Sequence, residues 1–512
     1  MRKLPRSPIN FALALLSAVL LIFTFPNWIE PSLGLPLLAP VALTPLLVAL
    51  AREPRPIFRF ALGQFAGIVY WFGICYWIQF VLEVHGGMGR VGSWATFLLF
   101  AVAKAIHLAV FSLFAAVLLD TPYAIPAIAA LWTGIERTHA TFGFAWLDLG
   151  NAAIDMPLLL RLAPITGVYG ISFLFALTSA VVAMILLRRG RRPVYWLAAI
   201  PALLLLPDLP APEAGSQTAL MVQPNMLEKD DWTEQQATHT RDSLVTLTTD
   251  SAANSGAKLI IWPEVPGPIY YYDDPLFRDE ATTLARNTQA YFLFGTVGQT
   301  PQRRPLNSAV MLAPDGNLID RYDKIHLVPF GEFVPPFFGW VNRISGEISD
   351  FVPGNRIVVF PAAEHRIGAF ICYESVFPHQ VRQFVKGGAQ ALVNISNDGY
   401  FGHSSAREQH LEIARMRAVE NSRWLLRVTN DGITAVIDPL GRITLRLPMY
   451  QISSALAKYN YRDGLTFYTS AGDWFAWGCL LAAIVALVHS QRPHYTRPAR
   501  ANRAGSPGRR RP

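Results

Sequence analysis

The chain has 512 residues, of which 52% are hydrophobic and only 16% are charged, and its formal net charge is +8. Soluble globular proteins usually carry about 25% charged residues, so the composition excludes an ordinary soluble enzyme and favours a membrane protein with a soluble insert. The basic residues cluster beside apolar segments and in the C-terminal tail, where membrane topology explains them. The positive charge therefore does not indicate nucleic-acid binding.

Eight apolar runs predict about eight transmembrane helices, seven in an N-terminal membrane domain and one near the C-terminus. A span needs roughly 20 apolar residues. The fifth and seventh runs are the weakest, because they are short and proline interrupts or ends them. The runs cover residues 10–26, 33–51, 57–82, 94–119, 121–135, 166–187, 194–207 and 472–489.

The pattern predicts four regions along the chain and a defined orientation in the membrane. If there are eight spans, the basic clusters at the N-terminus, after the second and sixth runs and after the last run lie on one side. Positive charge marks the cytoplasmic side, so both termini are predicted to be cytoplasmic and the soluble insert to face outward. No small-residue cleavage site follows the first run, which favours a retained anchor over a signal peptide. The regions are a membrane domain at 1–207, a soluble domain at 208–470, a membrane helix at 471–490 and a basic, disordered tail at 491–512.

Two ionisable residues stand out in the membrane domain. Lys104 and His107 are three residues apart and share one face of the predicted fourth span. Ionisable groups inside a membrane are costly and often functional, so both are candidates for contact with a lipid headgroup. The alternative is that they anchor the helix at the membrane interface.

The soluble insert alternates apolar strands with helical stretches, which predicts a layered α/β domain. A turn sequence at 314–317 and another at 438–441 each predict a hairpin. Thr233 followed three residues later by Gln236 predicts a capped helix start. Strands are expected at 218–223, 258–262, 291–295, 308–312, 318–322, 367–371, 391–395 and 424–428, and helices at 233–253, 275–289 and 405–423.

Three reactive side chains follow predicted strands of this insert. Glu264 comes just after the strand that ends at Trp262, Lys324 follows a hairpin strand, and Cys372 ends an apolar strand. Sites in α/β proteins are built where strands end at the carboxyl edge of a sheet. Cys372 is the only cysteine of the insert, so it has no disulfide partner there and is a candidate nucleophile. The alternative is a small buried core residue, which is the usual role of a free cysteine.

The chemistry of these three groups is complementary. A thiol is mostly protonated at neutral pH and needs a base or a cation beside it. Glu264 can take the thiol proton and return it to a leaving group, and Lys324 can stabilise the thiolate and the oxyanion of a tetrahedral intermediate. The histidines of the insert lack metal-ligand spacing and there is no cysteine pair, so neither a metal nor a cofactor is predicted.

An aromatic segment follows Glu332 directly and includes Phe337, Phe338 and Trp340. Apolar surface loops mark membrane or ligand contacts, and aromatic residues favour the bilayer interface. The segment is therefore predicted to enter the outer leaflet and admit lipid to Cys372. The alternative is a loop that folds onto its own domain.

The order of four short motifs resembles a known superfamily. Trp-Pro-Glu264, Tyr-Asp-Lys324, Val-Pro-Phe-Gly-Glu332 and Ile-Cys372-Tyr-Glu are similar to the carbon–nitrogen hydrolase (nitrilase) superfamily with its Glu-Lys-Cys triad. With the multi-span membrane portion, nearly the whole chain resembles the apolipoprotein N-acyltransferases. Segments 394–402 and 415–423 also resemble later motifs of that family. The departures are Pro224, where glycine is usual, and Tyr400, where tryptophan is common.

The resemblance implies a nitrilase-type αββα sandwich on the periplasmic side of a bacterial inner membrane. It implies acyl transfer from a membrane phospholipid, through a thioester on Cys372, to the amino group of a diacylglyceryl-modified N-terminal cysteine of a lipoprotein. Glu264 would be the general base and Lys324 the oxyanion stabiliser. Glu332, Tyr373 and Glu374 match accessory positions, and Trp232 matches a substrate-contacting tryptophan. Structural roles for Glu332, Glu374 and Trp232 remain open.

Two other functions compete with this one. A membrane-tethered amidase would use the same triad with water as the second nucleophile. A transporter or scaffold whose soluble domain has lost catalysis would not form an adduct on Cys372.

Overall fold

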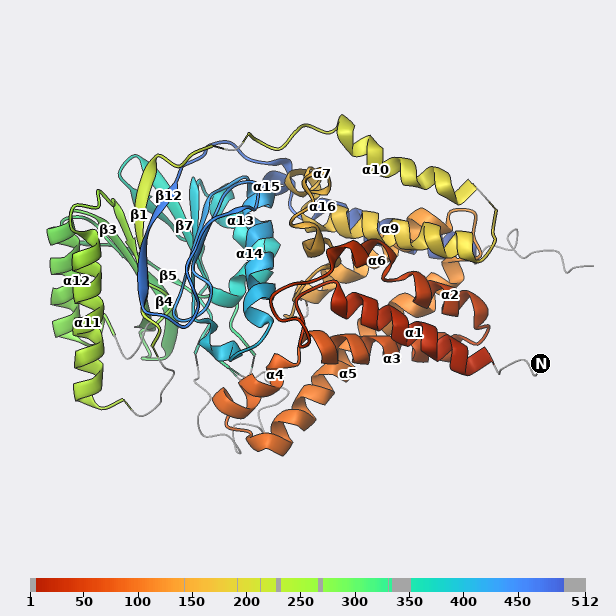
Figure 1. Cartoon of the computed structure of the whole chain (residues 1–512), viewed down its shortest axis with the longest axis horizontal. Helices are drawn as coiled ribbons and strands as arrows, with labels where there is room; N and C mark the ends of the chain where they lie inside the picture. The colour runs from red at the N-terminus through yellow and green to blue at the C-terminus, as the bar shows by residue number, and fades with distance from the viewer. Residues whose placement is uncertain are drawn as a thin grey trace, which may run out of the picture.

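A computed structural model describes residues 6–141, 143–190, 192–211, 213–226, 232–265, 270–329, 331–333 and 351–491. A helical region and a layered α/β sandwich lie side by side, and the C-terminal helix returns to the helical region (Figure 1).

The helical region is built from apolar helices that pack along one another (Figure 1). In the described part of the chain, three helices are long and apolar enough to cross a membrane: α3 Pro56–Ile74, α5 Gly89–Leu118 and α9 Val168–Leu186. The expected total of eight spans stays a prediction. The other elements of this region are α1 Arg6–Phe23, η1 Pro36–Val41, α2 Thr44–Arg52, α4 Trp77–Phe80, η2 Val81–His85, α6 Ala124–Thr141, η3 Leu149–Ala153, α7 Pro157–Leu160, α8 Ala163–Thr166, η4 Arg192–Ala198, α10 Ala199–Ala202, η5 Leu203–Leu205 and α16 Trp474–Ser490.

The seventh apolar run shows why the count of spans is difficult to predict. It forms η4, α10 and η5 in succession instead of one α-helix. Pro193 and Pro201 lie in this stretch, and proline removes a backbone donor and clashes with the preceding turn. Regular helical hydrogen bonding is therefore interrupted in this segment.

The sandwich contains two six-stranded mixed sheets with matching strand orders. The first has the order β12-β1-β2-β3-β4-β5, and the second has the order β11-β10-β9-β8-β7-β6. In each sheet three central strands run parallel, and antiparallel strands flank them. The strands are β1 Gln217–Gln223, β2 Leu259–Ile261, β3 Tyr291–Gln299, β4 Pro305–Leu312, β5 Leu318–Asp323, β6 Val359–Ala362, β7 His365–Ile371, β8 Ala391–Ser396, β9 Leu425–Thr429, β10 Ala435–Ile437, β11 Ile443–Arg446 and β12 Ser453–Tyr459.

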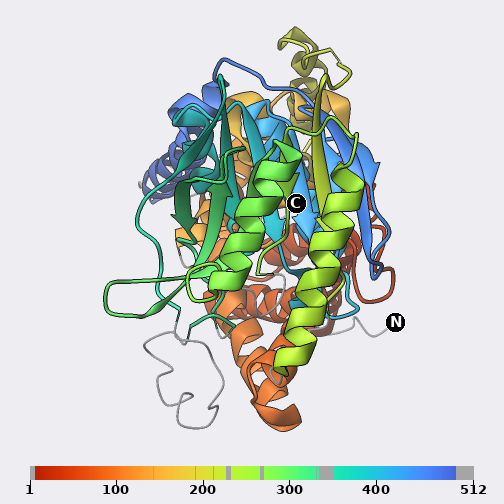
Figure 2. The same ribbon diagram turned by 90° about the vertical axis from the view of Figure 1, so that its left-hand side faces the viewer.

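Helices cover both outer faces of the sheet pair. Helices α11 Glu234–Ala252 and α12 Pro275–Thr288 lie over the first sheet (Figure 2). Helices α13 Pro378–Lys386 and α14 Ala406–Asn421 cover the second sheet and separate it from the helical region (Figure 1). The layer order confirms the predicted αββα sandwich.

The sequence located most elements of the sandwich to within a few residues. The capping box between Thr233 and Gln236 is present at the start of α11, and both predicted hairpins form. The predictions missed β6, β12 and α13. Strand β12 lies far along the chain from its partner β1, so local sequence carries no signal for this pairing.

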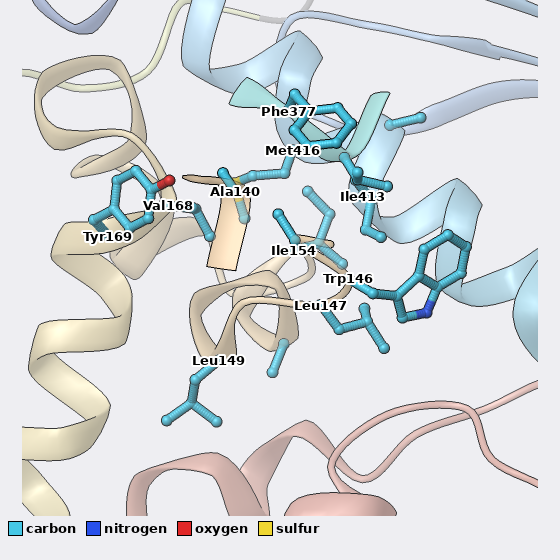
Figure 3. Close-up of a cluster of buried hydrophobic side chains, with 14 of the residues drawn as sticks. Ala140, Trp146, Leu147, Leu149, Ile154, Val168, Tyr169, Phe377, Ile413 and Met416 are labelled. Atoms are coloured by element: carbon cyan, nitrogen blue, oxygen red, sulfur yellow. The ribbon is translucent and has the colours of Figure 1, made fainter. Parts of the chain in front are cut away.

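A hydrophobic cluster joins the helical region to the sandwich (Figure 3). Trp146, Ile154 and Val168 come from the helical region, and Ile413 and Met416 come from α14. All of these side chains are buried. Removing apolar surface from water stabilises this contact, so helix α14 is fixed against the helical region.

Candidate active site

The three predicted reactive residues lie where strands of the two sheets end. Glu264 follows β2, Lys324 follows β5, and Cys372 follows β7. Strands β2 and β5 both run parallel to β3, so their carboxyl ends meet at one edge of the first sheet. All three side chains are buried.

A buried ion-pair cluster holds Glu264 and Lys324 together. Lys324 Nζ lies 3.1 Å from Glu264 Oε1 and 2.9 Å from Glu332 Oε1. The Asn307 amide donates to the same two oxygens, at 2.7 Å and 2.6 Å. The backbone N–H of Asn397 donates to Glu264 Oε2 at 2.9 Å. The predicted accessory residue Glu332 is therefore a direct partner of Lys324.

Burial and neighbouring charges adjust the protonation of this cluster. Burial raises the pKa of Glu264, the charge of Lys324 opposes that shift, and Glu332 adds to it. Burial alone would lower the pKa of Lys324, but Glu264 and Glu332 raise it well above its ordinary value, so this lysine stays charged. Burial and then the Glu264 charge raise the pKa of the Cys372 thiol, while Lys324 lowers it. The resting site therefore holds a neutral thiol beside a base and a cation.

Cys372 has an unusual backbone conformation. Its φ angle is +49°, in the left-handed region that non-glycine residues rarely adopt, and it begins the short helix η8 Cys372–Val376. Such a conformation costs on the order of 1–3 kcal/mol and persists only where surrounding contacts hold it. Strained residues of this kind cluster at functional sites.

Glu374 supplies much of that support. Its carboxylate accepts hydrogen bonds from the backbone N–H of Ile371 at 2.8 Å and of Ile325 at 2.7 Å. It also accepts from the Tyr322 hydroxyl and the Gln380 amide, both at 2.7 Å. Glu374 therefore ties the segment after Lys324 to the strand that ends at Cys372, which is an orienting arrangement.

Tyr373 turns from the nucleophile toward the helical region. Its hydroxyl donates to the carbonyl of Gly143 at 3.0 Å, and its ring stacks on Trp146 with an interplanar angle of 17°. Tyr373 therefore connects the sandwich to the segment that follows α6 of the helical region.

A cavity of about 810 Å³ connects the triad to the helical region. Glu264, Lys324 and Cys372 line it together with apolar side chains of α4, α5 and α6. Lys104 and His107 line the same cavity. The Lys104 ammonium donates to the carbonyl of Phe144 at 2.9 Å and lies 4.8 Å from the centre of the Trp71 ring. The other lining residues on the helical side are Trp77, Ile78, Val81, Leu82, Thr96, Phe100, Ala103, Ile106, Val110, Ile135, Thr138, Gly143 and Phe144.

The remaining predicted positions are not brought into this cavity. Trp232 lines a separate cavity of about 490 Å³ beside α11. Phe337, Phe338 and Trp340 lie outside the described residues. Within the described part of the chain, no cluster of three or more His, Cys, Asp or Glu side chains could hold a metal ion.

Comparison with known proteins covers both parts of the chain. Residues 17–181 match the family model of the apolipoprotein N-acyltransferase N-terminal domain, and residues 218–455 match the carbon-nitrogen hydrolase model. Apolipoprotein N-acyltransferases from Geobacter metallireducens and Chlorobaculum tepidum are 34% and 30% identical. Each alignment covers 94% of this chain and at least 96% of the relative. The chain belongs to the apolipoprotein N-acyltransferase family.

Solved structures with a similar fold include an amidase that matches about half of this chain. An amidase of the nitrilase superfamily from Nesterenkonia aligns with 50% of this chain and 95% of its own, at 17% identity and a TM-score of 0.38.

The structure describes the contacts around the two departures from the usual apolipoprotein N-acyltransferase pattern. Tyr400 lines the main cavity, and its ring centre lies 4.4 Å from that of His85. Pro224 precedes Asn225, which has a φ angle of +52° and donates its backbone N–H to the carbonyl of Asn430 at 2.8 Å. Neither position belongs to the ion-pair cluster.

Several polar residues of the site were not predicted. Asn307 lies inside strand β4, where no motif or strand end marks it. His410 and Arg427 lie behind Cys372 and are far from it in sequence. His410 lies in helix α14 and Arg427 in the buried strand β9, and nothing in the local sequence indicates that either side chain belongs to the site.

Proposed function

We propose that this protein transfers an acyl chain from a membrane phospholipid to the N-terminal amino group of diacylglyceryl-cysteine lipoproteins, through a thioester on Cys372. The observation that carries the proposal is that the Glu-Lys-Cys constellation lines the same cavity as apolar side chains of the membrane helices. Family membership as an apolipoprotein N-acyltransferase supports the same conclusion.

In the first step, Glu264 accepts the thiol proton and the Cys372 sulfur attacks the ester carbonyl of the phospholipid. Lys324 stabilises the developing oxyanion. When the intermediate collapses, the carbon–oxygen bond of the ester breaks and Glu264 gives its proton to the leaving lysophospholipid oxygen. The products are the thioester and a lysophospholipid, and Glu264 is again ionised.

In the second step, the lipoprotein amine attacks the thioester carbonyl. Glu264 accepts a proton from the amine, and the carbon–sulfur bond breaks when the second tetrahedral intermediate collapses. The proton then returns to the Cys372 thiolate. The amide product leaves, and both groups regain their starting protonation states.

The apolar cavity favours transfer over hydrolysis. A membrane-tethered amidase needs water beside the thioester, whereas side chains such as Phe100, Phe144 and Ile135 line the approach. Excluding water from a site prevents hydrolysis of a reactive intermediate. The amine of a diacylated lipoprotein can reach the thioester through the same apolar cavity that admitted the phospholipid.

We further propose the membrane arrangement that the basic clusters indicate. Residues 1–207 and 471–490 form eight spans of a bacterial inner membrane, residues 208–470 face the periplasm, and residues 491–512 form a cytoplasmic tail. The segment with Phe337, Phe338 and Trp340 enters the outer leaflet, and Trp232 contacts the acceptor. Replacing the three loop aromatics with serine would leave lipid turnover unchanged if the loop has no such role.

Mass spectrometry of the purified full-length protein after incubation with a phospholipid tests the proposal. The expected result is an acyl mass on the Cys372 peptide that hydroxylamine removes and that a diacylated lipopeptide discharges. Cys372→Ala should carry no adduct, whereas the matched variants Cys75→Ala and Cys479→Ala should keep it, because both cysteines lie in membrane helices or at their ends. An adduct that water discharges as fast as the lipopeptide would favour the amidase. Absence of any adduct would favour a scaffold.

A further inference from the structure

A fully buried polar network lies behind the nucleophile. It contains Ser375, Asp398, His410 and Arg427, and none of these side chains is exposed. His410 projects from α14, the helix that separates the second sheet from the helical region. Burying this many polar groups is costly unless each one is hydrogen-bonded, so the network has a defined geometry.

His410 contacts the backbone of the nucleophile itself. Its Nε2 lies 3.1 Å from the carbonyl oxygen of Cys372 and 2.7 Å from Ser375 Oγ. A carbonyl oxygen only accepts hydrogen bonds, so Nε2 carries a hydrogen and donates it. Burial, followed by the charge of Arg427, lowers the pKa of His410, which makes the imidazole neutral at neutral pH. Its Nδ1 lies 3.0 Å from Arg427 Nη2 and 3.3 Å from Asp398 Oδ1. The closer contact is to the Arg427 donor, so it agrees with the tautomer that carries its hydrogen on Nε2 and accepts at Nδ1.

Arg427 and Asp398 fix the tautomer and orientation of His410. Arg427 Nη2 lies 2.8 Å from each carboxylate oxygen of Asp398, so this donor is held between the carboxylate and the imidazole. A hydrogen bond from Arg427 to Asn394 fixes the other side of the guanidinium. Arginine keeps its proton at any accessible pH, so Nδ1 of His410 always faces a donor.

The ring is also held from the side of the membrane helices. The centres of the His410 and Trp146 rings are 5.6 Å apart. The Trp146 indole N–H donates to Gln409 Oε1 at 2.7 Å, and Gln409 Nε2 donates to the carbonyl of Pro26 at 2.7 Å. Adjacent residues of α14 thus contact the helical region and the nucleophile.

This arrangement addresses the strain at Cys372. Cys372 has a φ angle of +49° and begins η8, and His410 adds a side-chain hydrogen bond at the carbonyl of this strained residue. Holding that carbonyl fixes the rotation of the peptide and hence the direction of the Cys372 side chain. Without the donor, the residue can relax toward ordinary backbone angles and move its sulfur.

We propose that His410 is a positioning residue that holds the Cys372 thiol in its attacking orientation through a hydrogen bond to the Cys372 carbonyl. The proposal rests on the proposed thioester function. Asp398 and Arg427 set the tautomer that makes the bond, and Trp146 keeps the ring in place. His410 itself exchanges no proton with substrate.

The test compares His410→Gln with His410→Asn in the full-length enzyme in detergent. The glutamine amide reaches as far as Nε2 and can donate to the Cys372 carbonyl, whereas the shorter asparagine amide cannot, although both are polar and uncharged. Single-turnover thioester formation with a phospholipid gives the maximum rate and the half-saturating lipid concentration for each variant. A misplacement of about 1 Å costs roughly 100-fold in rate. We expect about that loss of maximum rate for asparagine, less than about a 10-fold loss for glutamine, and unchanged half-saturation for both.

Equal rates for the two variants, or a change confined to half-saturation, would overturn the proposal. Thermal unfolding of each variant separates this result from a general loss of folding. If His410 served packing alone, both variants would have a lower midpoint, and the longer glutamine would not be faster than asparagine. The Cys372→Ala control keeps the two proposals distinct. If Cys372→Ala still forms an acyl adduct, the thioester on Cys372 is refuted. If Cys372→Ala forms no adduct but both His410 variants form the thioester at the parent rate, only the positioning role is refuted.

Discussion

Replacing Glu264 by glutamine should strongly slow catalysis, and the stability of this variant relative to the parent should increase as the pH rises. The two carboxylates around Lys324 share one cation, so the buried cluster carries a net charge of −1 when both are ionised. Glutamine keeps the shape of the side chain and can still accept from the backbone of Asn397, but it removes that excess charge and the proton acceptor.

The two effects have different magnitudes and different dependence on pH. Loss of a positioned general base costs about 10²–10⁴-fold in rate, which corresponds to roughly 2.7–5.4 kcal/mol of transition-state stabilisation. The pKa of Glu264 in the folded protein is raised above its ordinary value of 4.5. Its contribution to stability is therefore complete below that ordinary value and is lost as the pH rises through the raised pKa. Glutamine does not titrate, so the stability of the variant relative to the parent should increase with pH.

Two measurements check this reasoning. Single-turnover thioester formation gives the loss of rate, and thermal unfolding in detergent from pH 5 to pH 9 gives the change in midpoint. Glu364→Gln is the matched control, because Glu364 is an exposed glutamate of the same domain and should change neither quantity. Thioester formation at the parent rate would refute the role of Glu264 as a base. A midpoint below that of the parent at every pH would refute the charge argument.

Three further changes follow from the same geometry. Lys324→Met should reduce thioester formation by about 10²–10³-fold, because it removes the oxyanion donor. It should also lower the thermal midpoint, because two buried carboxylates lose their cation. The control Lys458→Met, at an exposed lysine, should change neither quantity. Glu374→Gln should lower the thermal midpoint and slow alkylation of Cys372 by a small maleimide, because an amide cannot accept all of the hydrogen bonds that the carboxylate accepts. Ala103→Trp places a large ring in the cavity and should reduce turnover of phospholipids with 16-carbon chains more than of those with 8-carbon chains in mixed micelles, and equal loss for both would contradict a lipid path along α5.

The residues that the sequence predicted share a local signature. Glu264, Lys324 and Cys372 each follow a strand within a short motif, and functional sites in α/β proteins are built where strands end. Glu264 and Lys324 follow strands of the first sheet and Cys372 follows a strand of the second, so only the packing of the two sheets brings the three together. Glu332 was marked by its motif, although only the structure brings it to Lys324. Sequence order alone was sufficient for these positions because their chemistry depends on where strands end.

Other features depend on contacts between distant segments. Asn307 lies mid-strand, and only the folded sheet brings its amide between two carboxylates. His410 lies 38 residues from Cys372 in the sequence, on a helix whose polar residues are nearly all buried, so the sequence does not show which of them faces the nucleophile. Trp232, which the resemblance matches to a substrate-contacting tryptophan, lines a cavity separate from that of the triad, beside α11.

The shared cavity has a kinetic consequence. If one chamber receives both the phospholipid and the acylated acceptor, the two substrates bind in turn, and lysophospholipid must depart before the lipoprotein enters. Double-reciprocal plots should then be parallel, and excess phospholipid should compete with the acceptor for the acylated form. In a bilayer, where donor lipid is always abundant, the enzyme would rest as the acyl-cysteine species, and the arrival of a lipoprotein would set the pace of each cycle.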